Sequence, residues 1–438
     1  MMVGKQWIKN FSALAKNPAR ELALRLAEAA FDSIETRSVV RRAVSFTNSE
    51  FKVKDTVIPL EKGGRIFIVS SGKCSLAATL ELEEIIGERI TDGVVIDVEN
   101  RAPLKYTRFY LGDHPFPTEN NINATAEIIN LLSQVNQDDL VIFIISGGGS
   151  AFLCQPENHT CLEETMVTKT LFRHGATIEQ LNIVRKHLSR ARGGYLAQYA
   201  YPARVVSLIF SDVPGNNLST IASGPTVMDQ TTIEDAKRII GQCDKGGECQ
   251  LILNSLIETP KETKYFERVT NFLLLTNEVP LRAMADLALT LGLTPTIKNS
   301  AITGEACAIG EAIAKELALA LPGNVYLYGG ETTVTIHGVG RGNGGRNQEL
   351  ILGALSYLSP GEVILALASD GVDNSEYAGA LCDTMTSEQA KIANMLPERF
   401  LEQNDSTTFF TAVGDYLRVG YTGANVSDLI IALKLKHA

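Results

Sequence analysis

Two short segments have the residue types of an anion-binding loop. SGGGS, at residues 146–150, follows the most apolar run of the chain. Three consecutive glycines carry no Cβ atoms, so the backbone N–H groups can approach an anion closely. SSGKCS, at residues 70–75, places Lys73 between a predicted strand and a predicted helix, a position that suits a phosphate or carboxylate. The alternative for each segment is a tight turn without a ligand.

A third loop, GVGRGNGGRNQE at residues 338–349, contains two arginines. Gly340, Gly342 and Gly345 satisfy the dinucleotide pattern GxGxxG, but the run before them is rich in Thr and opens no leading βαβ unit. The loop could instead deliver Arg346 to an anionic substrate, because a guanidinium keeps its charge and binds carboxylate or phosphate through two hydrogen bonds. A structural salt bridge is the third reading of Arg346.

Acidic residues follow two other apolar runs. Asp212 follows the predicted strand at 205–210, and Asp370 and Asp373 follow the predicted strand at 363–368. Carboxylate oxygens at strand ends are suitable ligands for Mg²⁺ bound to phosphates. The alternative for each Asp is capping of a turn.

The elements that would position these residues are short apolar strands alternating with helices. The apolar runs lie at 65–73, 139–150, 204–215, 271–280, 324–338 and 362–373. Continuous apolar strands separated by helices predict an α/β fold with a doubly wound parallel sheet, and ligands then bind at the carboxyl ends of the strands. Alternating, Thr-rich runs in the later half predict a mixed sheet there. We expect two domains, 1–250 and 251–438, with the N-terminal helix as a candidate to pack on the second.

Composition limits the class of protein. Among 438 residues, 40 Lys and Arg face 50 Asp and Glu, for a net charge of −10. This balance argues against a nucleic-acid binder, which would present a basic face. No apolar run reaches the length that spans a bilayer, and no signal peptide is evident. We therefore expect a cytoplasmic protein whose partners are small molecules, and a homo-oligomer is left open.

The motifs together resemble one family, the glycerate 2-kinases whose C-terminal part is called the MOFRL domain. The matching strings include SSGKCSLAA, GDHPFPTENN, DLVIFIISGGGSAFL, IEQLNIVRKHLSRARGGYLA, LIFSDVPGNNLSTIASGPT, LYGGETTVTIHGVGRGNGGRNQEL and ASDGVDNSEYAGALCD. The resemblance implies two α/β/α three-layer domains, the first of them Rossmann-like, with the active site in the cleft between them. It also implies transfer of a phosphoryl group from ATP, with Mg²⁺, to the 2-hydroxyl of D-glycerate.

The resemblance also suggests roles for individual residues. Lys73 falls in the family's GSGK-like turn and Arg346 in its GGRNQE motif, the two residues usually held responsible for catalysis. The residues assigned to nucleotide or phosphate binding are Ser71, Gly72, Ser146, Gly147, Gly148, Gly149, Ser150, Gly344 and Gly345. Asn347 and Glu331 are assigned to the substrate, and Asp212 and Asp370 to the metal.

Three other functions remain open at this point. One is a nicotinamide-dependent hydroxypyruvate reductase, supported by GxGxxG alone. The others are a kinase of another small sugar acid and a non-enzymatic sensor of sugar acids or nucleotides. The presence of both Lys73 and Arg346 favours the kinase.

Overall fold

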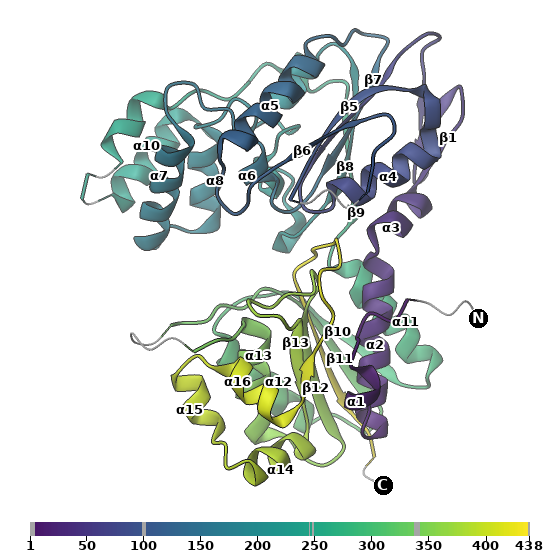
Figure 1. Ribbon diagram of the computed structural model, residues 1–438, viewed down its shortest axis with the longest axis vertical. Helices are drawn as coiled ribbons and strands as arrows, with labels where there is room; N and C mark the ends of the chain where they lie inside the picture. The colour runs from purple at the N-terminus through teal and green to yellow at the C-terminus, as the bar shows by residue number, and fades with distance from the viewer. Residues whose placement is uncertain (1–4, 99–101, 245, 248, 337–341, 437–438) are drawn as a thin grey trace. The chain divides into compact units, whose positions relative to one another are not determined.

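A computed structural model describes residues 5–98, 102–244, 246–247, 249–336 and 342–436 (Figure 1). Its contacts divide the chain into two compact units, which we call the middle unit, Thr36–Leu275, and the split unit, Met1–Glu35 with Thr276–Ala438. The expected boundary after residue 250 is therefore displaced to Leu275. The reason is that strand β9 (Val269–Leu275) pairs with β8 (Arg204–Phe210) and completes the sheet of the middle unit.

The middle unit contains a six-stranded sheet in the order β6-β5-β4-β7-β8-β9, with every pair parallel. The other four strands are β4 (Ile66–Ser71), β5 (Ile90–Asp97), β6 (Arg108–Leu111) and β7 (Leu140–Ile145). Every residue of β4 and β7 is buried, as the continuous apolar runs predict. A small antiparallel sheet of β1 (Val44–Phe46), β2 (Glu50–Val53) and β3 (Thr56–Pro59) precedes it.

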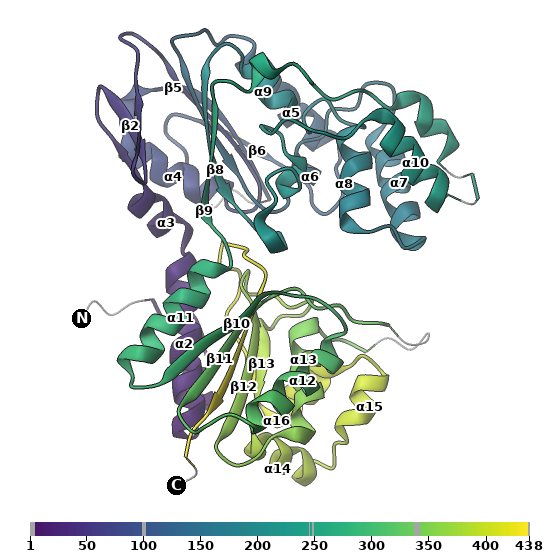
Figure 2. The ribbon, with the colours of Figure 1, turned by 180° about the vertical axis from the view of Figure 1, so that it is seen from behind.

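Four helices of the middle unit begin at a threonine that caps them. α5 (Glu119–Leu132), α7 (Cys161–Arg173), α8 (Ile178–Lys186) and α10 (Ile233–Cys243) each start with a capping box. α7, α8 and α10 gather with η4 (Gln250–Ser255) around a small core of their own, which both views place together (Figures 1 and 2). The remaining helical segments of this unit are α3 (Thr36–Ala43), α4 (Ser75–Ile86), η1 (Gly87–Arg89), α6 (Gly149–Phe152), α9 (Tyr195–Ala200), η2 (Pro214–Asn216), η3 (Ile221–Ser223) and η5 (Thr263–Tyr265).

The split unit contains a six-stranded sheet in the order β10-β11-β15-β12-β13-β14. β10 (Thr294–Ile302) and β11 (Asn324–Gly330) are parallel, and the other pairs are antiparallel, so the predicted mixed sheet is confirmed. The remaining strands are β12 (Glu362–Ala368), β13 (Gly379–Cys382), β14 (Tyr416–Leu417) and β15 (Asp428–Lys434).

Helices cover both faces of this second sheet. α2 (Pro18–Ile34) and α11 (Glu278–Thr290) lie on one face, and α12–α16 lie on the other (Figure 2). The helices on that other face are α12 (Ala306–Ala318), α13 (Arg346–Ala354), α14 (Thr384–Ile392), α15 (Pro397–Glu402) and α16 (Ser406–Val413), with η6 (Leu355–Tyr357) after α13. The unit is completed by α1 (Phe11–Leu14). No described helix is long and apolar enough to cross a membrane.

A buried arginine ties α2 to the rest of the split unit. Arg20 is fully buried, and its Nη2 lies 2.6 Å from Asp383 Oδ1 while its Nη1 lies 2.7 Å from Asp415 Oδ1. The two carboxylates and the Thr386 hydroxyl, 2.9 Å from Nη2, accept hydrogen bonds from one guanidinium. Removing one partner of such a pair would leave a buried charge uncompensated. This network explains why a helix near the start of the chain belongs with the last third of it.

The cap of α2 gives a direct test of this docking. The Asn17 side chain accepts a hydrogen bond from Arg20 N at 2.9 Å and donates one to Asp383 Oδ2 at 2.8 Å. We expect Asn17→Ala to lower the free energy of unfolding by about 1 kcal/mol, measured by urea denaturation. Asn130→Ala is the matched control, because Asn130 is an exposed residue within α5 and should change stability little. An equal effect of the two substitutions would contradict this role of Asn17.

Candidate functional site

The two predicted anion loops of the middle unit are interlocked. β4 and β7 are neighbouring parallel strands, so SSGKCS and SGGGS leave the same edge of the sheet. Ser146 N donates to Ser71 O at 3.1 Å, and Lys73 N donates to Gly147 O at 3.0 Å. Cys74 N also donates to Ser146 Oγ at 3.3 Å. The lysine turn and the glycine loop are therefore one structural feature, which we call the double loop (residues 70–75 and 146–150).

Glycine is required at two positions of the double loop by close packing. Gly72 has φ +132°, and a Cβ atom on it would collide with Ser146. A Cβ atom on Gly147 would collide with the carboxylate of Asp212. The absent side chain of Gly147 therefore lets Asp212, which follows β8, lie directly against the loop. Burial raises the pKa of Asp212, and the nearby positive charge of Lys73 opposes that rise.

Two neighbouring backbone N–H groups of the double loop, one on the buried Gly147 and one on the half-buried Gly148, have no hydrogen-bond acceptor among the described residues. The half-buried Lys73 lies beside them, since its Cγ would be 3.4 Å from a Cβ atom on Gly148. The neighbouring Gly149 N–H is different, because it donates to Ser146 O at 3.1 Å. A cation and two amide donors thus lie together at the strand ends, the arrangement that binds oxyanions.

Further polar residues around the double loop were not predicted as site residues. His114 lies near Gly148, because its Cδ2 would be 3.2 Å from a Cβ atom placed on that glycine. The centre of its ring lies 6.0 Å from the centre of the Phe152 ring. Although His114 is an exposed residue, desolvation and the charges of Lys73 and Arg185 lower its pKa to about 4. The imidazole is therefore neutral at pH 7. Only the long-range fold brings His114 to the loop, so spacing in the sequence carried no signal of it.

In the split unit, Arg346 is held between two carboxylates. It is the first residue of α13, and its Nη2 lies 3.0 Å from Glu331 Oε1 and 3.1 Å from Asp428 Oδ1, while its Nε also donates to Asp428. Glu331 follows β11 and Asp428 begins β15, and these strands pair so that Gly330 lies opposite Asp428. The antiparallel register therefore brings the two acids together. The Nη1 atom also donates a long hydrogen bond of 3.4 Å to Glu331 Oε2, and the Arg346 side chain as a whole remains 31% exposed.

The start of α13 is capped by an acid from another part of the chain. Asp373 is buried and accepts hydrogen bonds from Asn347 N at 3.1 Å and from Gln348 N at 3.0 Å. It also accepts one from Asn347 Nδ2 at 3.2 Å. Asn347 is only 1% exposed. These contacts hold Asn347 next to Arg346 at the start of α13. The assignment of Asn347 to substrate binding stays a prediction.

The glycines before Arg346 pack against neighbouring residues. A Cβ atom on Gly345 would collide with Asp373, and one on Gly344 would collide with Ser406. This packing accounts for both glycines without a ligand, so their assignment to phosphate also stays a prediction. Gly340, the first glycine of the GxGxxG pattern, lies outside the described residues.

The two acidic turns proposed for a metal lie in different units. Asp212 belongs to the middle unit, beside Lys73, whereas Asp370 belongs to the split unit. Asp370 Oδ1 accepts a hydrogen bond from Val372 N at 3.1 Å. Asp370 therefore caps its own turn, which is the alternative to metal binding that the sequence left open for it. Within the described ranges, no group of three or more His, Cys, Asp and Glu side chains is arranged to hold a metal ion by itself.

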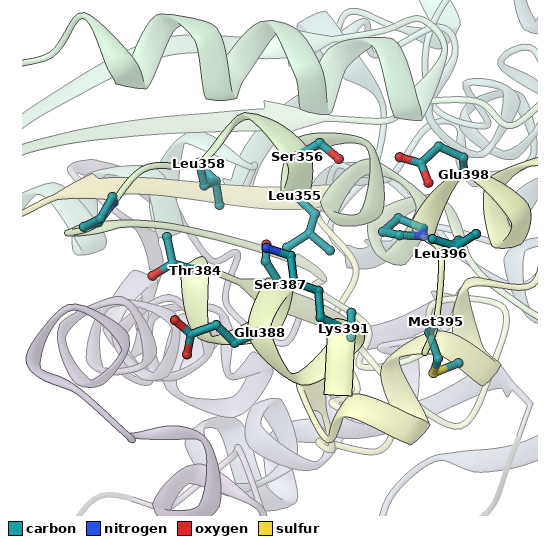
Figure 3. Close-up of a pocket in the computed structure, with 13 residues that line it drawn as sticks. Leu355, Ser356, Leu358, Thr384, Ser387, Glu388, Lys391, Met395, Leu396 and Glu398 are labelled. Atoms are coloured by element: carbon teal, nitrogen blue, oxygen red, sulfur yellow. The ribbon is translucent and has the colours of Figure 1, made fainter. Parts of the chain in front are cut away.

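A pocket of about 700 Å³ in the split unit is separate from these residues. It is lined by η6, α14 and α15, with Glu388, Lys391 and Glu398 among its polar side chains (Figure 3). None of the residues that the sequence assigns to catalysis, substrate or metal lines it.

The buried carboxyl of Asp373 should make stability depend on pH. Burial, followed by the charge of Asp428, raises the pKa of Asp373 to about 6, above an ordinary value near 4. The folded chain therefore holds a proton that the unfolded chain has lost between about pH 4 and pH 6. Its contribution to stability is fully present below about pH 4 and is lost as the pH rises through about 6.

Asp373→Asn tests this dependence, because asparagine does not titrate. In urea unfolding between pH 4 and pH 7, we expect the wild type to lose stability relative to Asp373→Asn as the pH rises. Two curves that stay parallel over this range would show that Asp373 titrates normally. Asp428, whose pKa burial also raises to about 6, is present in both proteins, and because its charge interacts with that of Asp373 the difference between the curves includes this interaction.

Comparisons with known proteins place most of the chain in two conserved regions. Residues 22–250 match the family described as "Domain of unknown function (DUF4147)", and residues 324–428 match the MOFRL family. The D-glycerate 2-kinase of Thermotoga maritima is 34% identical over 90% of this chain and 96% of its own length. The glycerate 2-kinase of Pyrococcus horikoshii is 34% identical over 94% of this chain and 97% of its own.

Further comparisons agree on the fold and add a second name. A protein of Agrobacterium vitis, named as a candidate hydroxypyruvate reductase, is 36% identical over 91% of this chain and 94% of its own length. The crystal structure of glycerate kinase from Thermotoga maritima matches 95% of this chain and 99% of its own, with a TM-score of 0.83 and 31% identity. The resemblance and the α/β fold class predicted from the sequence are thereby confirmed.

Proposed function

We propose that this chain, which belongs to the family of glycerate 2-kinases that carry a MOFRL domain, transfers a phosphoryl group from ATP to the 2-hydroxyl of D-glycerate. The products are 2-phosphoglycerate and ADP. The observation that carries the proposal is the double loop, where Lys73 lies beside the N–H groups of Gly147 and Gly148.

The double loop supplies what phosphoryl transfer needs most from a protein. The transferred group passes through a transition state in which negative charge spreads over its oxygens, so catalysis depends on positioning and electrostatic stabilisation. In our proposal the two N–H groups bind phosphate oxygens, and the Lys73 ammonium neutralises the developing charge. The contact between Lys73 N and Gly147 O fixes the lysine relative to these donors.

Arg346 is proposed to act in the same reaction. A guanidinium can bind a phosphoryl group or the glycerate carboxylate through two parallel hydrogen bonds. Glu331 and Asp428 fix the plane of the guanidinium and leave part of the side chain exposed. Burial disfavours the charged form of Arg346, but the attraction of Asp428 and Glu331 outweighs it and raises the pKa, so Arg346 stays protonated.

The donors present in the middle unit fit Mg²⁺ bound together with a nucleotide. Mg²⁺ usually takes one or two protein carboxylates, with phosphate oxygens and water completing its six ligands. Asp212 is a single carboxylate placed against the double loop, so it would hold the ion. Asp370, which belongs to the split unit, is the second candidate. When bound, Mg²⁺ would neutralise charge on the phosphates. The absence of a larger acidic group among the described residues agrees with this shared mode of binding.

A coupled assay for ADP tests the proposal. With ATP and Mg²⁺ present, we expect ADP release that depends on D-glycerate and is much slower with glycerol, which lacks the carboxylate. A protein that is folded and binds ATP, yet releases no ADP with D-glycerate, would contradict the proposal. Oxidation of NADH by hydroxypyruvate in the same preparation would support the reductase instead.

A further inference from the structure

Arg185 differs from the other basic residues of its segment in having no acidic partner within the described part of the chain. The run of basic side chains comprises Arg185, Lys186, Arg190 and Arg192. Lys186 Nζ lies 3.1 Å from Asp229 Oδ1, Arg190 Nε donates to Glu157 Oε2 at 2.9 Å, and Arg192 Nη1 lies 2.7 Å from Glu164 Oε1. Among the described residues, the Arg185 side chain makes no hydrogen bond or ion pair, although it is half-buried.

The fold directs this part of α8 toward the double loop. Ser150, the last residue of SGGGS, has its Oγ 2.9 Å from Ser223 Oγ. Ser223 Oγ in turn donates to Asn182 Oδ1 at 3.0 Å, and Asn182 is on α8. Arg185 follows Asn182 by three residues, so the two side chains leave the same face of the helix. A continuous set of hydrogen bonds thus connects the loop to the helix face that carries Arg185.

The side chain of His114 lies near both Arg185 and Lys73. The imidazole lies against Gly148, and both Lys73 and Arg185 are close enough for their charges to disfavour its protonation. The charged groups that act on Arg185 itself are Arg192, which repels it, and Glu164, which attracts it but already pairs with Arg192. Lys73 and the neutral imidazole therefore lie beside Gly148, and Arg185 lies near that imidazole. Within the described ranges, no acid pairs with Arg185 directly.

A half-buried guanidinium without an anion has lost water without gaining a partner, which is costly. A bound oxyanion would supply the missing acceptor with charge-assisted hydrogen bonds. The N–H groups of Gly147 and Gly148, which make no hydrogen bond in the part of the chain that the structure describes, are further donors in this region. The charges of Lys73 and Arg185 and the polarity of these amides all favour an anionic group.

We propose that Arg185 is a binding residue of the active site, whose guanidinium holds an oxyanion of a substrate on the double loop together with Lys73. The inference rests on the proposed function and extends it by one residue. The shared chemistry is a phosphate or carboxylate oxygen, which either the ATP triphosphate or the glycerate carboxylate supplies.

Arg185→Gln tests the inference, with Arg190→Gln as the matched control. Arg190 is an exposed arginine of the same basic run, paired on the surface with Glu157. We expect Arg185→Gln to raise the KM of one substrate about tenfold or more, the size of one lost charge-assisted contact. A rise in the KM of ATP assigns the contact to phosphate, and a rise in the KM of D-glycerate assigns it to the carboxylate. Arg190→Gln should change neither value.

A binding measurement without turnover separates this inference from the proposed function. We expect tripolyphosphate or D-glycerate to raise the melting temperature of the wild type, and that shift to shrink for the same anion in Arg185→Gln. This result holds even if the wild type does not phosphorylate D-glycerate, in which case only the proposed function fails. Unchanged KM values and unchanged protection in a folded Arg185→Gln protein would overturn the inference. If Arg185→Gln does not fold, Arg185→Lys is the second variant, because lysine keeps the charge but lacks the planar pair of donors of a guanidinium. We expect Arg185→Lys to bind the anion more weakly than the wild type does. Binding equal to that of the wild type would overturn the inference.

Discussion

Replacing Arg346 with glutamine is expected to lower kcat by about a thousandfold or more, the range found when an arginine that stabilises a transferring phosphoryl group is removed. Arg346 is partly exposed, charged and held in a fixed plane by Glu331 and Asp428. Glutamine keeps a polar side chain at this position but carries no charge. The measurement is single-turnover and steady-state ADP release with ATP, Mg²⁺ and D-glycerate.

Two further variants show whether the loss comes from the guanidinium itself. Arg346→Lys keeps the charge but cannot pair with two carboxylates in the same plane, so it should recover only a small part of kcat. Arg282→Gln removes an exposed arginine of the same unit, paired with Glu278, and should leave kcat unchanged. Because Asp428 is buried and loses its partner in Arg346→Gln, circular dichroism and the melting temperature must confirm that the variant is folded. A folded Arg346→Gln protein with near-normal kcat would remove Arg346 from the mechanism.

Lys73→Met is expected to lower kcat by about a hundredfold to a thousandfold, the usual cost of removing one donor aimed at developing charge. Methionine retains the length and much of the apolar stem of lysine, and the backbone contact between Lys73 N and Gly147 O does not depend on the side chain. The double loop should therefore remain folded. The measurement is the same assay, with kcat and the KM of ATP determined separately.

Whether the substitution changes kcat or the KM of ATP shows which role Lys73 has. A loss mainly in kcat means that the ammonium acts in the transition state, whereas a rise in the KM of ATP alone means that it only binds the nucleotide. Lys62→Met is the matched control, because Lys62 is an exposed lysine of the same unit. The role proposed here would be refuted by a Lys73→Met protein whose kcat matches that of Lys62→Met.

Local sequence patterns were sufficient to predict the fold class. Strands such as β4 and β7 are buried at every residue, and a strand buried on both faces needs a continuous apolar run that is visible in the sequence. The boundary between the two units was harder to predict from the sequence. β9 is only partly buried over most of its length, and α2 joins the split unit through the ion pairs of Arg20 with Asp383 and Asp415. Contacts so far apart along the chain leave no periodic signal.

In the candidate site too, residues in short sequence motifs were predicted, whereas residues brought together by pairing of distant segments were not. Lys73, Ser146 and Gly147 lie in short motifs at strand ends, where the position of ligands in α/β sheets is predictable. The acids that surround Arg346 come from three separate segments, and only Glu331 among them was predicted to bind the substrate, an assignment that stays a prediction. Asp428 was not predicted because its position depends on the pairing of β11 with β15. Arg185 was indistinguishable from its basic neighbours until their acidic partners were known.

The central claim is most directly tested by identifying the phosphorylated product. The protein would be incubated with ATP, Mg²⁺ and D-glycerate, and the phosphorus spectrum recorded by ³¹P NMR with coupling to hydrogen retained. Phosphate on the 2-hydroxyl is coupled to one hydrogen and gives a doublet, whereas phosphate on the 3-hydroxyl is coupled to two and gives a triplet. The account predicts the doublet of 2-phosphoglycerate, and either the triplet or the absence of any new phosphate ester would contradict it.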